Sequence, residues 1–124
     1  VFTAESAEEG RKILEQKPIH VILSDQRMPK TTGIEFFESI LESFPEPIRI
    51  LITGYTDINA VIDSINRGQV YKYLTKPWNE DDIKNFIIKA YEVYKLRKEN
   101  EELTNKLMDL NKKLEFLARQ NLLS

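Results

Sequence analysis

Apolar residues recur along the chain with two different spacings. A spacing of three or four residues predicts three helices, which cover 4–16, 34–43 and 57–67. Short apolar runs predict three strands, which cover 19–24, 48–52 and 70–74. The nearly continuous run of the first strand predicts that both of its faces are covered, and the second strand is also expected to be buried. From Glu80 onward the chain contains neither Pro nor Gly, which predicts one long helix. The predicted order is helix, strand, helix, strand, helix, strand, helix.

Residues that favour helix ends support these boundaries. Ser6 and Asp57 are predicted N-caps of the first and third helices, because their side chains can accept hydrogen bonds from free backbone amides. Lys17 and Pro18 are expected to end the first helix, and Gly68 the third. Ahead of the first strand, His20 is expected to be a solvated edge residue.

The alternation of strands and helices predicts an α/β fold with a parallel sheet and right-handed crossovers. In such sheets, functional residues gather at the carboxyl ends of the strands. Three polar clusters fall at those ends: Asp25, Thr53-Gly54 and Thr75-Lys76-Pro77. The topology therefore brings a carboxylate, a hydroxyl and an ammonium group to one edge of the sheet.

Composition narrows the possible chemistry. The chain has 124 residues, 41% hydrophobic and 31% charged, which suits a folded domain of ordinary size. A net charge of −2 argues against a generally basic, nucleic-acid-binding surface. The absence of Cys excludes disulfides, thiol catalysis and zinc-thiolate sites. A single His leaves no His-based metal cluster and argues against a catalytic triad. No apolar run approaches the roughly 20 residues of a membrane span, and no signal peptide opens the chain, so we expect a cytoplasmic protein.

The polar residues at the strand ends suit an anionic, tetrahedral group. By itself Asp25 could be a nucleophile, a metal ligand or a cap. Lys76 adds a compact positive charge, and Thr53 beside Gly54 leaves room for a phosphoryl group near the backbone. An Asp carboxylate can accept that group as an acyl phosphate, and Mg²⁺ often joins carboxylate to phosphate. Phosphoryl chemistry at Asp25 is the interpretation that accounts for all three residues.

Three motifs, in order, carry a family resemblance. They are Leu23-Ser24-Asp25-Gln26-Arg27-Met28-Pro29 with Gly33, then Ile52-Thr53-Gly54-Tyr55, then Tyr73-Leu74-Thr75-Lys76-Pro77-Trp78. The stretch 1–92 resembles the receiver domain of bacterial two-component response regulators, which has a flavodoxin-like, doubly wound parallel sheet. The motifs look most like receivers that precede HD-related c-di-GMP phosphodiesterase or AAA+ activator modules.

The resemblance implies a role for each matching residue. Asp25 matches the residue that takes a phosphoryl group from a histidine kinase, and Lys76 matches the lysine that pairs with it. Thr53 matches the switch hydroxyl that moves to the phosphoryl group, and Tyr73 matches the aromatic residue that turns inward in response. Gly54 matches the small position that keeps the site open.

Further matches concern the surroundings of the site. Pro77 is expected to follow a cis peptide bond. Mg²⁺ would be held by Asp25 and by the backbone carbonyl of Arg27. The signalling face would cover about residues 57–90, and Trp78 would anchor the last helix.

The resemblance has one departure. Receivers hold Mg²⁺ with an acidic pair at the end of their first strand, and no such strand precedes Val1 in this sequence. Residues 1–3 resemble the end of the second strand. In the strand order 2-1-3-4-5 the missing strand is central. We therefore expect that residues 1–124 alone neither fold normally nor complete the Mg²⁺ site.

Apolar residues of the last predicted helix recur with heptad spacing. One heptad position holds Phe86, Val93, Asn100, Leu107, Leu114 and Asn121, and the other holds Lys89, Leu96, Leu103, Leu110 and Leu117. This pattern predicts a parallel, two-stranded coiled coil over 93–124, with Asn fixing the register and Glu92 pairing with Arg97 of a second copy. A homodimer would then relay the signal to a C-terminal effector domain. The simpler interpretation is a long helix that packs on its own domain.

Two other functions stay open. One is a degenerate receiver that is not phosphorylated and acts as a dimerisation module. The other is a small phosphatase-type enzyme with Asp25 as its nucleophile. Such enzymes usually carry a second Asp two residues later as the general acid, and Arg27 stands there instead.

Overall fold

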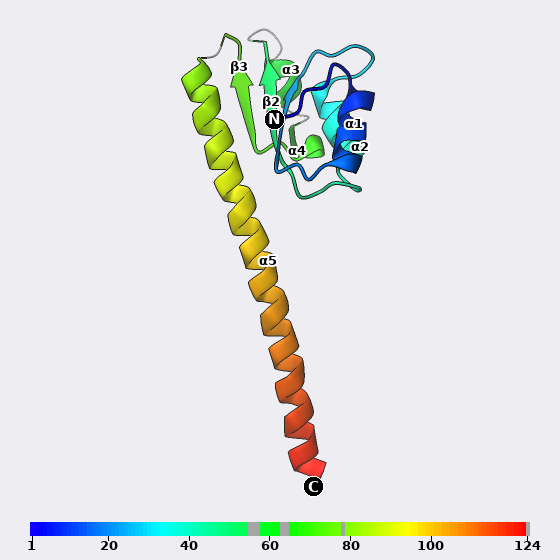
Figure 1. The fold of residues 1–124 in the computed structure, drawn as a ribbon, viewed down its shortest axis with the longest axis vertical. Helices are drawn as coiled ribbons and strands as arrows, with labels where there is room; N and C mark the ends of the chain where they lie inside the picture. Colours follow the sequence, from blue (N-terminus) through cyan, green and yellow to red (C-terminus); the bar gives the residue numbers. More distant parts are fainter. Residues whose placement is uncertain (55–57, 63–64, 78, 124) are drawn as a thin grey trace. The chain divides into compact units, whose positions relative to one another are not determined.

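A computed structural model describes residues 1–54, 58–62, 65–77 and 79–123. The chain forms two compact units, Val1–Tyr94 and Lys95–Ser124. The first holds the sheet and most of the helices (Figure 1), and the second is the continuation of the last helix.

The first unit contains a parallel sheet, as predicted. Its strands are β1 (Val21–Asp25), β2 (Ile48–Thr53) and β3 (Lys72–Thr75), in the order β1-β2-β3. All six residues of β2 are buried. Leu23 in β1 is 39% exposed, and so is Tyr73 in β3. The prediction of a buried strand is therefore right for β2 and wrong for β1, because β1 forms an edge of the described sheet. The other edge is β3.

The helices differ from the prediction mainly at their ends. The helices before the last one are α1 (Ala7–Gln16), α2 (Gly33–Ile40), α3 (Ile58–Ile62) and α4 (Ile65–Gly68). Ser6 caps α1 as predicted, with its hydroxyl accepting from the Glu9 amide at 3.2 Å. The predicted third helix is described as two short helices, and its predicted cap Asp57 lies outside the described residues. Gln69, with φ of 49°, rather than Gly68, adopts the left-handed conformation after α4.

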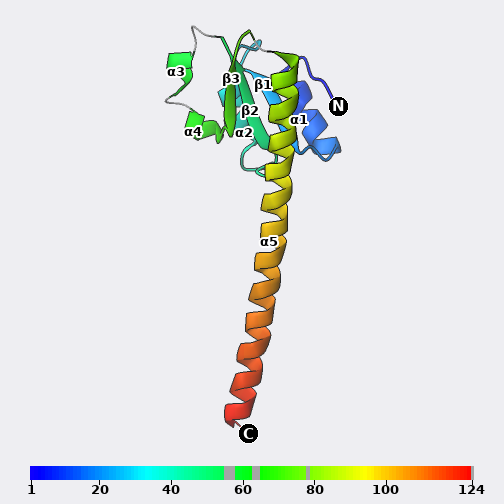
Figure 2. The same cartoon turned by 90° about the vertical axis from the view of Figure 1, so that its left-hand side faces the viewer.

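Two apolar clusters pack against opposite faces of the sheet, because neighbouring residues of β2 point to opposite sides. On one side Leu51 packs with residues of α1, α2 and α3: Leu14, Ile34, Phe36, Phe37, Ile40 and Val61. On the other side Ile48 and Ile50 pack with Ala90 of α5 (Glu80–Leu123). The start of α5 therefore covers one face, and the shorter helices cover the other (Figure 2).

Residues 1–3 are not a strand, contrary to the prediction. They are exposed, and the Lys17 ammonium lies 6.0 Å from the centre of the Phe2 ring. A strand needs a hydrogen-bonding neighbour, and none of the described strands pairs with this segment.

The second unit is helical throughout its described part. Its leucines at the predicted heptad positions are 53–65% exposed: Leu96, Leu103, Leu107, Leu110, Leu114 and Leu117. Met108 and Phe116, which lie outside those positions, are also exposed. Within the part of the chain that the structure describes, we find no helix with the length and apolar character needed to cross a bilayer.

Candidate phosphoryl-acceptor site

The carboxyl ends of the three strands meet, as the topology predicted. Asp25 is the last residue of β1 and lies beside Ile52, while Thr53 at the end of β2 lies beside Thr75. Hydrogen bonds continue the ladder past the strands. The Gln26 amide donates to the Ile52 carbonyl at 2.8 Å, and the Lys76 amide donates to the Thr53 carbonyl at 3.0 Å. The backbones that carry Asp25 and Lys76 are thus both fixed to β2.

This arrangement brings the side chains of Asp25 and Lys76 together. The Lys76 Nζ atom donates to Asp25 Oδ2 at 2.6 Å, and the two side chains are 41% and 39% exposed, respectively. An ion pair this exposed contributes at most about 1 kcal/mol to stability, because water and salt screen it. Its importance is chemical, since it places a positive charge beside a solvent-accessible carboxylate.

The loop after Asp25 is organised by Gln26, which the sequence analysis did not single out. The Gln26 carbonyl accepts from the Gly33 amide at 3.0 Å, and its side-chain Oε1 accepts from the Ile34 amide at 3.1 Å. The Arg27 amide donates to Asp25 Oδ1 at 3.2 Å. Gln26 thereby ties the first turn of α2 to the end of β1. A polar residue next to a buried strand was the only signal in the sequence.

Gly33 is required here for space. A Cβ atom at this position would lie 2.6 Å from the Asp25 carbonyl oxygen and 2.7 Å from Leu51 Cδ1. Because both neighbours are fixed, one by the backbone and one by the core, no side chain fits without displacing the loop. The start of α2 can approach Asp25 only because residue 33 is glycine.

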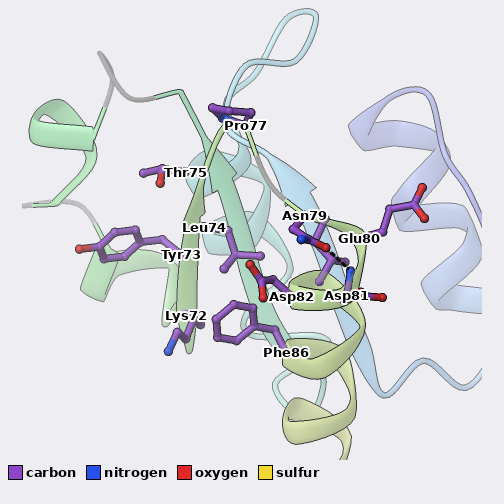
Figure 3. Close-up of a pocket in the computed structure, with 11 residues that line it drawn as sticks. Lys72, Tyr73, Leu74, Thr75, Pro77, Asn79, Glu80, Asp81, Asp82 and Phe86 are labelled. Carbon is purple, nitrogen blue, oxygen red and sulfur yellow. Dashed lines mark hydrogen bonds between the residues drawn. The ribbon is translucent and has the colours of Figure 1, made fainter.

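The residues that match the switch lie on β2 and β3. Thr53 is completely buried, and its hydroxyl donates to the carbonyl of the next residue, Gly54, at 3.4 Å. The Tyr73 ring is 39% exposed and points away from α5 (Figure 3). The peptide bond between Lys76 and Pro77 is cis, as expected. Tyr55 and Trp78 lie outside the described residues.

A hollow lies beside this site, between β3 and the start of α5 (Figure 3). Lys72, Leu74 and Phe86 contribute to its lining, and the Lys72 ammonium lies 4.6 Å from the centre of the Phe86 ring. Acidic residues of the first turn of α5 also line it, namely Glu80, Asp81 and Asp82. Neither Asp25 nor Lys76 lines the hollow, so it is separate from the ion pair.

The donor set for a metal is incomplete within the described residues. Asp25 supplies one carboxylate, and in those ranges no three His, Asp or Glu side chains are grouped to hold an ion. Mg²⁺ requires near-octahedral oxygen coordination and usually uses one or two carboxylates together with water and phosphate oxygens. Asp25 would be one of the carboxylates that such a site uses.

Comparison with known proteins agrees with this geometry. A family model described as the response regulator receiver domain matches residues 1–88. The hydrogenase transcriptional regulatory protein HoxA of Cupriavidus necator is 42% identical over 97 residues, which are 78% of this chain and 20% of that protein. The chain thus spans about a fifth of the length of this curated relative.

Solved structures show the same fold. A protein from Rhodopirellula baltica described as an adenylate cyclase is 32% identical, with a TM-score of 0.79, and the match covers 86% of this chain and 79% of that one. The signal receiver domain of an HD domain-containing protein from Pseudomonas fluorescens is 27% identical, with a TM-score of 0.71, and the match covers 77% and 71%. With its three strand-end motifs, parallel sheet and long C-terminal helix, the chain belongs to the response regulator receiver domain family.

Proposed function

We propose that Asp25 accepts a phosphoryl group from a histidine kinase and that the change is relayed through α5 to an effector domain. The observation that supports this most directly is the 2.6 Å contact between Lys76 Nζ and Asp25 Oδ2 at the carboxyl edge of the sheet. It holds a solvent-accessible carboxylate beside a fixed cation, as a phosphoryl acceptor requires.

The transfer step is a displacement at phosphorus. An Asp25 carboxylate oxygen forms the new P–O bond while the P–N bond to the kinase imidazole breaks, and the imidazole takes up a proton. The product carries about −1.5 to −2 charges and three acceptor oxygens. Lys76 compensates part of that charge. Asp25 acts as an acceptor, so we infer a regulatory domain rather than an enzyme.

Mg²⁺ would need further oxygen ligands besides those proposed here, and water and phosphate oxygens commonly serve. Within the chain, Asp25 and the Arg27 carbonyl are the proposed ligands. The Arg27 amide already donates to Asp25, which keeps the two residues adjacent. When bound, Mg²⁺ would neutralise the charge of the transferred group. Among the described residues, no strand precedes β1 to carry the acidic pair that receivers use.

Thr53 and Tyr73 are the proposed switch. The Thr53 hydroxyl now donates to Gly54, and Gly54 leaves space for it to turn toward a phosphoryl oxygen. The Tyr73 ring, now exposed, would turn inward when Thr53 moves. Pro77 shapes the loop that presents Lys76. Phosphorylation would thereby bias a surface with two states.

The second unit is the proposed dimerisation element. We place the functional boundary at residue 92, with a receiver over 1–92 and a coiled-coil linker over 93–124. Exposed leucines at heptad spacing support a parallel homodimer, because water-exposed stripes of this kind are covered by a second helix in coiled coils. We expect the assembly to work in the cytoplasm without direct contact to nucleic acid or membrane.

Labelling of the intact protein with acetyl phosphate tests the proposal. Asp25→Asn removes the attacking oxygen and should abolish labelling, whereas Asp109→Asn, on the exposed part of α5, should leave it unchanged. Labelling that persists in Asp25→Asn would contradict the assignment. An intact wild-type protein that dimerises but takes no label would instead favour the degenerate receiver.

A further inference from the structure

His20 occupies a different environment from the solvated edge expected from the sequence. Its ring lies 4.8 Å from the Tyr94 ring at an interplanar angle of 72°, and 5.4 Å from the Tyr91 ring at 77°. Both contacts are edge-to-face, the arrangement that the charge distribution of aromatic rings favours. One imidazole therefore contacts two tyrosines of α5 at once.

The backbone of His20 is anchored to the sheet. Its carbonyl accepts from the Ile48 amide at 2.9 Å, one position before the Val21–Ile48 pair that opens the ladder. His20 therefore precedes β1, and Asp25 ends the same strand. A hydrogen-bonded strand of five residues is a rigid connection between the two.

The tyrosines mark the place where α5 leaves the first unit. Tyr94 packs with Ala90 and Val93 against the β2 cluster and is the last residue of that unit. The helix continues without interruption into Lys95. Tyr91 is 41% exposed, and its ring contact with His20 restrains this turn.

We propose that His20 is a positioning residue that clamps the last turn of α5 in the receiver, and that the state of Asp25 reaches residues 95–123 only while this clamp is intact. The second part rests on the proposed function. The clamp acts on α5 from the residue just before β1, the strand that ends in Asp25, whereas Thr53 and Tyr73 lie on β2 and β3. It is therefore a separate connection between the acceptor and the output helix.

Hydrogen exchange of the intact, resting protein tests the clamp itself. Each edge-to-face contact changes an opening equilibrium by about two- to twelvefold. His20→Ala should therefore raise the exchange rates of amides 91–94 about tenfold. His20→Phe, which keeps an aromatic edge, should restore most of the protection, whereas His20→Leu, which keeps only apolar bulk, should not. Ile88→Ala, at a 57% exposed position of the same helix, is the matched control and should have little effect.

Two results would overturn the clamp. One is unchanged exchange of these amides in His20→Ala. The other is full protection in His20→Leu, which would show that bulk rather than the ring contact holds the helix.

The relay is tested with beryllofluoride, which mimics the phosphoryl group on Asp25. In the wild-type protein, beryllofluoride should change the exchange rates of amides 95–100. In His20→Ala this response should be lost. Acetyl phosphate should still label Asp25 of that variant to within about twofold of wild type. A retained response would contradict the relay, and so would parallel loss of labelling, which indicates general damage. Absence of labelling in wild type would instead contradict the proposed function, and the resting exchange rates would still decide the clamp.

Discussion

Phe37 in the unit Val1–Tyr94 is completely buried, whereas Phe116 in the unit Lys95–Ser124 is 61% exposed. Both are helical phenylalanines at apolar positions of the sequence. The two units differ in the elements that can cover an apolar side chain. The first has a sheet with helices against both faces, so its apolar residues are covered within the unit. The second is a single helix, whose apolar residues can be covered only from outside that helix.

The largest expected effect separates these two phenylalanines. Phe37→Ala leaves a cavity in a closed core and should lower the free energy of unfolding of the intact protein by about 3–5 kcal/mol. Phe116→Ala, the matched substitution, should change it by less than about 0.5 kcal/mol. Urea unfolding measures both. Equal effects would show that the second unit is packed as tightly as the first.

A smaller effect is expected where α2 approaches Asp25. Gly33→Ala forces a Cβ atom into the space between the Asp25 carbonyl and Leu51, and should cost about 1–3 kcal/mol. Gly10→Ala is the milder comparison, because its nearest neighbour, the end of the Phe36 ring, lies at 3.2 Å rather than 2.6 Å and Ala favours the helix. Urea midpoints compare the two. Tolerance of Gly33→Ala would mean that the loop is looser than described.

An effect on dimerisation, which depends on protein concentration, is expected only for substitutions in the second unit. Leu110→Ala removes an exposed side chain at a heptad position. It should weaken the dimer by several hundredfold, since each of the two chains loses about 2 kcal/mol of burial. Met108→Ala, exposed but off the heptad positions, should weaken it far less. Sedimentation equilibrium of the intact protein measures both. A monomer at high concentration in the wild type would argue against the coiled coil.

The smallest effect on stability is expected at the site itself. Lys76→Met breaks an ion pair that is about 40% exposed, so the unfolding free energy should change by less than about 1 kcal/mol. Labelling of Asp25 should nevertheless slow markedly, because the cation beside the acceptor is lost. Stability and labelling are measured on the same sample, and loss of both together would point to a structural role for Lys76.

The periodic parts of the sequence predicted the fold well. The three strands, their parallel order and the meeting of Asp25, Thr53 and Lys76 follow from apolar runs and from where they end. Burial of β1 on both faces was mispredicted, because an apolar run does not reveal that its strand lies at an edge of the sheet. The continuous helix predicted over 57–67 is described as α3 and α4.

Contacts between distant residues could not be predicted in this way. Gln26 is one polar residue in a loop, and only the structure shows that it joins β1 to α2. His20 was expected to be solvated, yet its ring contacts Tyr91 and Tyr94, which lie far away along the sequence. Local patterns carry no information about such pairings.

The central claim is that Asp25 is the phosphoryl acceptor. The most direct test is to label the intact wild-type protein with acetyl phosphate, reduce the acyl phosphate with borohydride and locate the modified residue by peptide mass spectrometry. The account predicts modification of the peptide that contains Asp25, and of no other carboxylate. Modification at a different residue, with Asp25 unchanged, would contradict it.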